Sequence, residues 1–307
     1  MSFEAVLIAG PTASGKSALA LALARTGRFA LVNADSMQVY REIRVLSARP
    51  SADEEATAPH LLFGFVSVLA PFSVARWVEA AASARAEIRG GGLTPIFVGG
   101  TGLYFHALQN GLSPIPAIAP ETRAAVRAQR DALGAAAFYA DLVARDPSAE
   151  ALNANDTQRV LRAAEVLEET GEALSAWQSL KGEAVLDPAR CLKVVLAPPR
   201  ETLYARCDAR FDAMMADGAL EEARAIQALG LDPAMPAARA LGLSHLARHL
   251  SGEIPLDQAV AEAKRDTRRY AKRQMTWFRR FMADWRAEPD PKRPGLIQEL
   301  LTLFEQG

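Results

Sequence analysis

The sequence predicts an α/β fold, a doubly wound parallel sheet with an all-helical insertion domain, from three observations. A short apolar run at residues 5–9 passes through a glycine-rich turn into a helix-forming stretch at 18–25. Apolar runs typical of strands then alternate with a helical pattern up to residue 98. From Glu121 to about Leu180, by contrast, the pattern is helical and carries no strand signal.

The remaining elements are predicted in chain order. Short runs rich in β-formers predict strands at residues 29–32, 61–69, 95–98 and 192–196. Apolar positions from Trp77 to Ile88 predict a helix between the second and third of these runs. Longer helices are predicted at residues 202–229 and 256–281.

Prolines set the expected domain boundaries, because Pro114, Pro116 and Pro120 form a stiff connector before the helical stretch. Three parts are expected: a core domain at residues 1–112 and 190–285, a helical insertion domain at 113–189, and a C-terminal tail at 286–307. Within the tail, residues 286–295 carry three prolines and are expected to be loosely held before one last short helix.

The composition is that of an ordinary globular protein without bulk charge. The 307 residues are 50% hydrophobic, and 35 lysines and arginines face 36 aspartates and glutamates, for a net charge of -1. A nucleic-acid partner would have to meet a local basic patch. Cys191 and Cys207 are expected to be buried thiols.

The expected localisation and assembly rest on sequence patterns that are missing. No apolar run approaches the roughly 20 residues of a membrane span, and Met1 to Gly10 lacks the features of a signal peptide. We therefore expect a cytoplasmic protein that binds no membrane. No exposed heptad or apolar stripe demands a partner chain, so a monomer is expected.

Residues 10–17 carry the strongest motif. Gly10, Pro11, Thr12, Ala13, Ser14, Gly15, Lys16 and Ser17 fit G-x-x-x-x-G-K-[ST] between a predicted strand and a predicted helix. The backbone N–H groups of such a loop form an anion site, Lys16 adds a charge, and the Ser17 hydroxyl can ligate Mg²⁺. The motif predicts a P-loop NTPase-like core that binds a diphosphate or triphosphate, and it leaves the reaction open.

Two polar segments follow predicted strands, at the sheet edge where ligands bind in open α/β folds. Asp35, Ser36 and Gln38 follow the strand predicted at residues 29–32. Asp35 is the candidate general base or a Mg²⁺ ligand. The alternative is that Asp35 caps a following helix. Thr101 stands among three glycines after the run at 95–98 and could donate to a substrate oxygen, unless it caps the next helix.

A local basic stripe predicts a partner with a phosphate backbone. Eight basic residues oppose only Asp266 in this stretch: Lys264, Arg265, Arg268, Arg269, Lys272, Arg273, Arg279 and Arg280. Their doublets recur every four residues, so they share one side of a helix. The alternative is a solvated helix face. Gln158, Arg159 and Arg162 form a second basic group in the insertion.

Arg206 and Arg210 lie four residues apart on the helix predicted after Pro199. One of them could reach the phosphate site from the side opposite the loop. The alternative is a salt bridge with Asp208 or Asp212.

Five motifs together resemble the bacterial tRNA dimethylallyltransferases, or tRNA isopentenyltransferases, of the IPP transferase family. They are Gly10 to Ser17, Asp35-Ser-Met-Gln-Val-Tyr40, Val98-Gly-Gly-Thr-Gly-Leu-Tyr104, Asn155-Asp-Thr-Gln-Arg159 and Ala271-Lys-Arg-Gln-Met-Thr-Trp277. The resemblance implies transfer of a dimethylallyl group from dimethylallyl diphosphate to the N6 amine of adenosine 37 in tRNAs that read codons beginning with U. The products would be i6A and diphosphate, and no ATP would be consumed.

The resemblance also implies roles for single residues. Lys16, Ser17 and Mg²⁺ would neutralise the leaving diphosphate, Thr101 and Arg210 would bind near its bridging oxygen, and Asp35 would accept the amine proton. Contacts with the tRNA anticodon stem-loop are expected, from the resemblance and the basic stripe, at Asp35, Ser36, Met37, Gln38, Thr101, Arg123, Gln158, Arg159, Val160, Leu161, Arg162, Arg268, Lys272 and Arg273.

The sequence departs from the family pattern at a few positions. Leu46-Ser47 stand where Gly-Thr is usual, Arg49 where Lys is usual, Gly64 where an acidic residue is usual, and Leu243-Ser244 where Tyr-Lys is usual. We expect these changes to alter contacts and tRNA affinity rather than the reaction. From the loop and Asp35 alone, a P-loop kinase of a metabolite or nucleoside, or a non-catalytic RNA-binding nucleotide sensor, remain alternatives.

Overall fold

The chain divides into two compact units, and each is described by itself. Unit 1 comprises residues 1–109 and 185–307, and unit 2 comprises residues 110–184. The computed structural model describes residues 3–306, so residues 1, 2 and 307 of the predicted domain ranges lie outside the described residues. The expected insertion, 113–189, lies within five residues of the observed unit 2 at each end.

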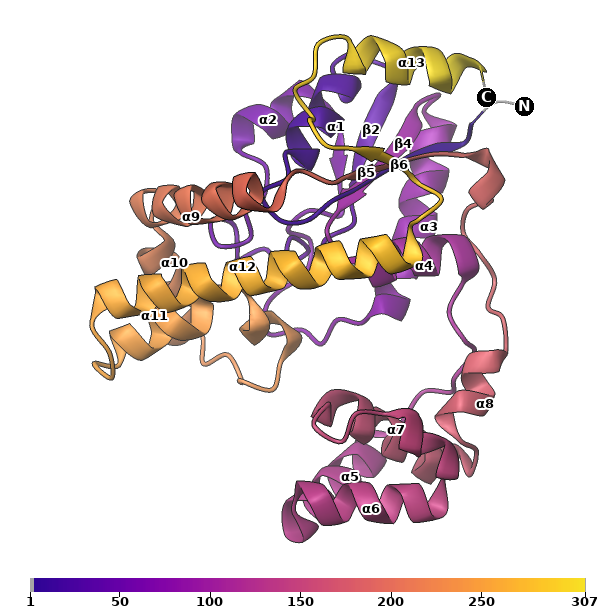
Figure 1. The fold of residues 1–307 in the computed structure, drawn as a ribbon, viewed down its shortest axis with the longest axis vertical. Helices are drawn as coiled ribbons and strands as arrows, with labels where there is room; N and C mark the ends of the chain where they lie inside the picture. Colours follow the sequence, from indigo (N-terminus) through magenta and orange to yellow (C-terminus); the bar gives the residue numbers. More distant parts are fainter. Residues whose placement is uncertain (1–2, 307) are drawn as a thin grey trace. The chain divides into compact units, whose positions relative to one another are not determined.

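Unit 1 is built on a parallel sheet with the strand order β3-β2-β4-β1-β5-β6 (Figure 1). The strands are β1 (Ala5–Ala9), β2 (Phe29–Asn33), β3 (His60–Leu61), β4 (Thr94–Gly99), β5 (Cys191–Leu196) and β6 (Arg286–Glu288). Ala9 at the end of β1 is aligned with Gly99 of β4 and with Val195 of β5. The sheet therefore brings the loop after β1 and the loop after β4 to one edge.

The helices of unit 1 cover both faces of this sheet, which confirms the doubly wound α/β fold. They are α1 (Lys16–Ala24), α2 (Ala52–Thr57), α3 (Val74–Gly90), α4 (Gly102–Asn110), α9 (Arg200–Ala216), α10 (Ala219–Ala228), α11 (Leu243–Leu250), α12 (Leu256–Phe281) and α13 (Leu296–Gln306). Val6 and Ile8 of β1 pack in the cluster that contains α1 and α13, and Leu7 packs in the cluster that contains α3 and α4. This alternation is expected of a strand whose successive side chains point to opposite faces.

Two predicted elements are shorter than the sequence suggested. The strand predicted at 61–69 pairs with β2 only at His60–Leu61, because Leu62 and Gly64 adopt φ angles of 64° and 58° that turn the chain out of the sheet. The helix predicted at 202–229 is two helices, α9 and α10, with a turn at Gly218, whose φ is 96°. The helix predicted at 256–281 is confirmed as α12.

The last short helix is confirmed as α13, but the prediction that residues 286–295 are loosely held is wrong. β6 extends the sheet beside β5, with Arg286 aligned to Val194. Leu296 and Leu300 of α13 are each 1% exposed and pack on the same side of the sheet as α1. Between β6 and α13, Arg293 binds Glu288 and Glu299. The prolines of this segment form a bend between two packed elements.

The secondary structure of unit 2 is all helical in its described residues, with no strand, as predicted. Its helices are α5 (Pro120–Leu133), α6 (Ala135–Arg145), α7 (Thr157–Thr170) and α8 (Leu174–Ser179). Val126 of α5, Phe138 and Leu142 of α6 and Val166 of α7 form the centre of its separate core. Three short 3-10 turns lie at Pro147–Ala151 in this unit and at Pro188–Arg190 and Pro236–Arg239 in unit 1.

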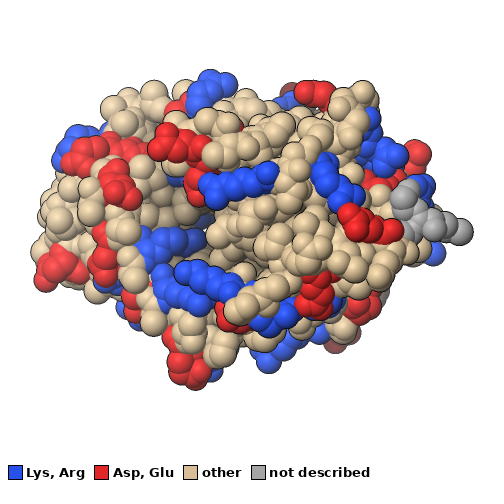
Figure 2. All heavy atoms as spheres, turned by 90° about the horizontal axis from the view of Figure 1, so that it is seen from above, with Lys and Arg blue, Asp and Glu red and all other residues tan. Residues whose placement is uncertain are grey.

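The surface carries both signs of charge, in keeping with the net charge of -1. On the face drawn in Figure 2, blue lysine and arginine side chains border a hollow, whereas acidic side chains are scattered over the rest. Cys191 and Cys207 are 4% and 0% exposed, which confirms that both are buried thiols. Between residues 3 and 306, no helix is long and apolar enough to cross a membrane.

Candidate active site

The glycine-rich loop, residues 10–15, joins β1 to α1 as predicted. Gly15 precedes α1 without a side-chain cap, so the first N–H groups of the helix are available to a ligand. Ser14 donates its backbone N–H to the Pro11 carbonyl at 3.2 Å, which closes the loop on itself. On the outer side of the loop Pro291 approaches so closely that a β-carbon at Gly15 would lie 2.8 Å from its Cγ.

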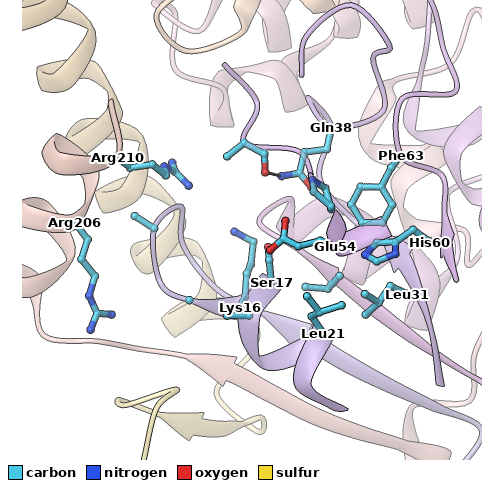
Figure 3. A pocket seen from close by; sticks show the side chains of 16 residues that line it. Lys16, Ser17, Leu21, Leu31, Gln38, Glu54, His60, Phe63, Arg206 and Arg210 are labelled. Carbon is cyan, nitrogen blue, oxygen red and sulfur yellow. Dashed lines mark hydrogen bonds between the residues drawn. The ribbon is translucent and has the colours of Figure 1, made fainter. Parts of the chain in front are cut away.

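A pocket of about 400 Å³ opens beside the loop (Figure 3). Its polar wall contains Lys16, Ser17, Glu54 and two arginines of α9, and its apolar wall contains Leu21, Leu31 and Phe63. Ser17 is exposed on the first turn of α1, so its hydroxyl is accessible from the pocket. A polar end beside an apolar wall suits a ligand that joins an anion to a hydrocarbon.

Lys16 is a buried cation that lines this pocket. Its side chain is 7% exposed, and Nζ donates to the Pro11 carbonyl at 3.5 Å. Burial lowers the pKa of Lys16 to about 8, the carboxylate of Asp35 raises it, and Arg210 lowers it further. The ammonium is therefore incompletely compensated, and a bound anion would stabilise its charged form.

Arg210 reaches the loop from α9, and the salt-bridge alternative for the α9 arginines is wrong. Arg210 donates to the hydroxyl of Thr12, and burial lowers its pKa while Asp35 raises it. Asp208 instead binds Arg268 of α12 at 2.5 Å, and Asp212 binds Lys264 at 2.6 Å. Arg206 lines the same pocket as Arg210.

Asp35 stands in a turn held by Asn33, at the end of β2. Its backbone N–H donates to Asn33 Oδ1 at 2.8 Å, and its Oδ1 accepts from the Met37 N–H at 2.9 Å. The helix-cap alternative is wrong, since residues 36–39 form turns and the next helix is α2. The second oxygen, Oδ2, would lie 3.3 Å from a β-carbon at Gly100, so Asp35 faces the segment after β4.

Thr101 meets the Asp35 segment directly. Its Oγ1 accepts from the Ser36 N–H at 2.9 Å and donates to Ser36 Oγ at 3.3 Å. The hydroxyl therefore binds the neighbouring strand's loop rather than capping α4. Gln38, by contrast, is 7% exposed and donates its amide to the carbonyls of Ser47 and Ala48. It supports the pocket wall from inside.

Helix α12 contributes residues that the sequence analysis did not assign to the site. Tyr270, Gln274 and Trp277 share one side of the helix. The pKa of Tyr270 is raised by burial and by the nearby Asp35, and Gln274 bonds to both Thr12 and Gly100. Gln274 and Trp277 stand in the fifth motif, so the sequence did mark them. A motif does not show, however, whether a side chain points into the site.

The basic stripe of α12 is partly neutralised by acidic side chains of α9 and of α12 itself. Arg268 is bound to Asp208 and Arg269 to Asp266. Lys272 and Arg273 are exposed, and among residues 3–306 neither has an acidic partner, although Arg273 lies over the Tyr270 ring. These two side chains are the most available cations among those predicted to contact tRNA on this helix.

In unit 2 the predicted tRNA residues fall into exposed and buried sets. Arg123, Gln158 and Arg159 are exposed, and Arg162 is half-buried with a pKa lowered by burial and by Arg123 nearby. Val160 is buried in the core of the unit, and Leu161 packs against that core. Asp156 caps α7, because its side chain accepts from the Arg159 N–H at 3.2 Å.

Comparison with known proteins identifies the family. The family model described as IPP transferase matches residues 38–281, and the model described as isopentenyl transferase matches residues 3–59. The chain belongs to the IPP transferase family. The resemblance of the five motifs is thereby confirmed.

Relatives and solved structures in this family match along almost the whole chain. A tRNA dimethylallyltransferase of Methylocella silvestris is 55% identical over 278 residues, covering 90% of this chain and 92% of the relative. One of Parvibaculum lavamentivorans is 52% identical over 303 residues, covering 98% and 96%. The crystal structure of the full-length tRNA isopentenylpyrophosphate transferase of Bacillus halodurans matches with a TM-score of 0.69 and 30% identity, covering 99% of this chain and 95% of that one. A eukaryotic dimethylallyltransferase acting on tRNA matches with a TM-score of 0.78 and 25% identity, covering 98% and 77%.

The departures from the family pattern lie around the site rather than in it. Leu46 is buried, and a β-carbon at Gly242 would lie 3.4 Å from it. The backbone N–H groups of residues 44–46 all donate to the carboxylate of Glu222, which anchors this loop to α10. Leu243 is buried in the core and Ser244 is exposed at the start of α11.

Proposed function

We propose that this chain transfers a dimethylallyl group from dimethylallyl diphosphate to N6 of adenosine 37 in tRNAs that read codons beginning with U. Diphosphate leaves and i6A remains. Family membership supports the prenyl transfer, and the names of the relatives, tRNA dimethylallyltransferases, support the two substrates. The observation that carries the mechanism is that Asp35 lies close enough to Lys16 and Arg210 for its negative charge to oppose the lowering of both pKa values by burial. A carboxylate that can act as a base thus lies beside the positive charges of Lys16 and Arg210.

The cationic and N–H groups around the loop would act on the leaving group. As the bond from carbon to the bridging oxygen breaks, negative charge grows on the diphosphate, and Lys16, Arg210 and the N–H groups at the start of α1 would stabilise it. Because these groups are already fixed around the loop, they need little reorganisation during the reaction. The Thr101 hydroxyl would donate near the bridging oxygen.

Asp35 would act on the nucleophile. The N6 amine attacks the carbon that loses the diphosphate, and the proton released from the new ammonium centre passes to a carboxylate oxygen of Asp35. The Met37 N–H and the Asn33 side chain fix the position of this carboxylate. Oδ2, which faces Gly100, is the oxygen we assign to proton transfer.

The residues present fit Mg²⁺ at the loop. Mg²⁺ usually takes one or two protein oxygens together with substrate phosphates and water, and Ser17 offers an accessible hydroxyl in the pocket that holds Lys16. When bound, Mg²⁺ would supply further charge for the departing diphosphate.

The RNA would be held by basic side chains and would have to present its target base outside the stack. Lys272 and Arg273 of α12, and Arg123, Arg159 and Arg162 of unit 2, are the proposed phosphate contacts. We further propose that the protein works in the cytoplasm as a monomer, which sedimentation of the purified chain tests.

A single assay separates this function from the kinase and sensor alternatives. The chain is incubated with Mg²⁺, unmodified tRNA reading a codon that begins with U, and labelled dimethylallyl diphosphate, without ATP. Label on adenosine 37 is the expected result. Unlabelled tRNA, together with phosphorylation of a small molecule in a parallel incubation with ATP, would support a kinase instead. Unlabelled tRNA that is bound without either reaction would support the sensor.

The role of Asp35 is tested by Asp35→Asn, with Asp217→Asn, an exposed residue after α9, as the matched control. We expect turnover to fall by about 10²- to 10⁴-fold, the usual contribution of a general base, while tRNA affinity stays within about twofold. If tRNA affinity falls as much as turnover, Asp35 recognises RNA and is not the base.

A further inference from the structure

Gln274 joins two parts of the active site. It lies on the inner side of α12 and is 6% exposed. Its Nε2 donates to the Gly100 carbonyl at 2.8 Å, and its Oε1 accepts from the Thr12 N–H at 2.9 Å. One side-chain amide therefore bridges the loop that binds the diphosphate and the segment that carries Thr101.

The chemistry of this bridge is specific to a carboxamide. The Gly100 carbonyl needs a donor and the Thr12 N–H needs an acceptor. A planar side-chain amide offers its nitrogen and its oxygen side by side for these two bonds. A β-carbon at Gly100 would collide with Nε2, so the glycine is needed for this close approach. Removing the amide would leave a backbone N–H and a carbonyl without these partners.

The neighbours of Gln274 on α12 also touch the site. Tyr270, one turn before, lies near enough to Asp35 for that carboxylate to raise its pKa. Trp277, one turn after, packs its ring on Gly102, where a β-carbon would collide with it. Three consecutive inward positions of one rigid helix thus contact the loop, the Asp35 environment and the Thr101 segment.

We propose that Gln274 is a positioning residue for the transfer reaction, an inference that rests on the proposed function. It sets the spacing between Thr12 and Gly100, so that a diphosphate held by the loop lies within reach of the Thr101 hydroxyl. Thr101 is in turn bonded to Ser36 at 2.9 Å, next to Asp35. The bridge therefore fixes the leaving-group site relative to the base.

The first test is Gln274→Met, with Gln258→Met as the matched control. Gln258 is an exposed residue at the start of the same helix, where its amide donates to Glu262. Three quantities are measured: kcat from single turnover at saturating substrates, Kd of inorganic diphosphate by calorimetry, and Kd of tRNA by filter binding.

We expect Gln274→Met to lower kcat by about ten- to a hundredfold, the scale of a misplacement of reacting groups by roughly an ångström. Affinity for inorganic diphosphate should fall severalfold, while tRNA affinity and the control variant stay within about twofold of the unmodified chain. A kcat within twofold of the unmodified chain would overturn the proposal. So would a parallel loss of kcat and tRNA affinity, which indicates general loosening.

The second test is Gln274→Glu and remains informative if the methionine variant does not fold. A protonated glutamic acid can donate to Gly100 and accept from Thr12 as the amide does, whereas the carboxylate repels the Gly100 carbonyl. Burial favours the neutral form. The ratio of the variant's kcat to that of the unmodified chain should therefore rise as pH falls from about 8 to 6, because the acid form is restored. A ratio that is flat with pH contradicts the bridge.

The two proposals fail in different ways. If the unmodified chain places no label on tRNA, the proposed function is wrong, whatever Gln274 does. Inorganic diphosphate binding still decides the bridge in that case, because it needs no reaction. An affinity unchanged by Gln274→Met would then overturn the positioning role.

Discussion

The guanidinium of Arg49 occupies the space in which a β-carbon at Gly64 would stand. Its Nη1 donates to the carbonyls of Tyr40 and Arg41, both at 3.3 Å, and Gly64 has a φ of 58°, which favours glycine. Both positions are among those at which the sequence analysis found departures from the family pattern. The arginine and the glycine thus form one fitted pair, which holds the turn beside the pocket residue Phe63.

This pairing predicts that Gly64→Asp alone destabilises the fold. We expect the free energy of unfolding to fall by about 1–3 kcal/mol, through backbone strain and the collision with Arg49. Adding Arg49→Lys should recover part of the loss, as measured by urea unfolding. Gly27→Asp is the control, since Gly27 has a φ of 78° and nothing within 4 Å of a β-carbon. If Gly27→Asp lowers the free energy of unfolding equally, backbone strain alone explains the effect and the collision with Arg49 contributes nothing.

Burial of Lys16 predicts that Lys16→Met stabilises the protein at pH 7. Its folded pKa of about 8 lies below the ordinary 10.5, so below pH 8 both states carry the proton and the folded state bears the full cost of the buried charge. The cost fades between pH 8 and 10.5, where the folded state alone is neutral. We expect Lys16→Met to raise the free energy of unfolding at pH 7 by on the order of 1–3 kcal/mol. Exposed Lys181→Met should change little, and equal unfolding curves for both variants would contradict the prediction.

The same pKa predicts how diphosphate binding responds to pH. Between pH 7 and 9 the unbound protein loses the Lys16 charge, so its affinity for inorganic diphosphate should fall relative to that of Lys16→Arg, whose guanidinium stays charged. Calorimetry of both proteins across this range gives the ratio directly and cancels the ionisation of the ligand. A constant ratio would mean that Lys16 does not titrate there.

Lys272 and Arg273 predict the salt dependence of tRNA binding. Each exposed cation that meets a phosphate releases a counterion, so Lys272→Gln and Arg273→Gln should each reduce the slope of log Kd against log salt by about 1. Arg25→Gln, at the end of α1, serves as the control. If all three variants keep the original slope, the RNA does not meet this side of α12.

Packing of α13 predicts that Leu300→Ala is costly. Leu300 is 1% exposed against the sheet, and removing its side chain should lower the free energy of unfolding by about 2–5 kcal/mol. Gln298→Ala, on the exposed side of the same helix, should stay within about 0.5 kcal/mol. If the two variants lose similar free energies of unfolding in urea, the packing of Leu300 does not stabilise the fold and the prediction is wrong.

Local motifs predicted the part of the site that is local in sequence. Gly10 to Ser17 folds as expected because a strand, a glycine-rich turn and a helix are fixed by neighbouring residues. Asp35 and Thr101 were both predicted to lie at the sheet edge where ligands bind, and the bonds between Ser36 and Thr101 show that their two segments meet there. The roles assigned to these residues stay predictions.

Features that depend on distant pairing were missed. The three residues of β6 carry too little pattern to be recognised, and they form a strand because β5 offers an open edge. The true partners of Asp208 and Asp212 were not predicted, because sequence spacing suggests partners on the same helix, whereas Arg268 and Lys264 come from α12, which lies alongside α9. Gln274 was quoted in a motif, yet its inward direction depends on how α12 packs.

The contact between Pro291 and Gly15 has a consequence for the order of events during synthesis. The loop at residues 10–15 leaves the ribosome early, whereas Pro291 and the β6 strand that positions it follow nearly the whole described chain later. Domains generally fold as their residues emerge. A nascent chain can therefore form its central strands well before the outer side of the phosphate loop is covered, and its affinity for diphosphate should mature only after Pro291 has emerged from the ribosome.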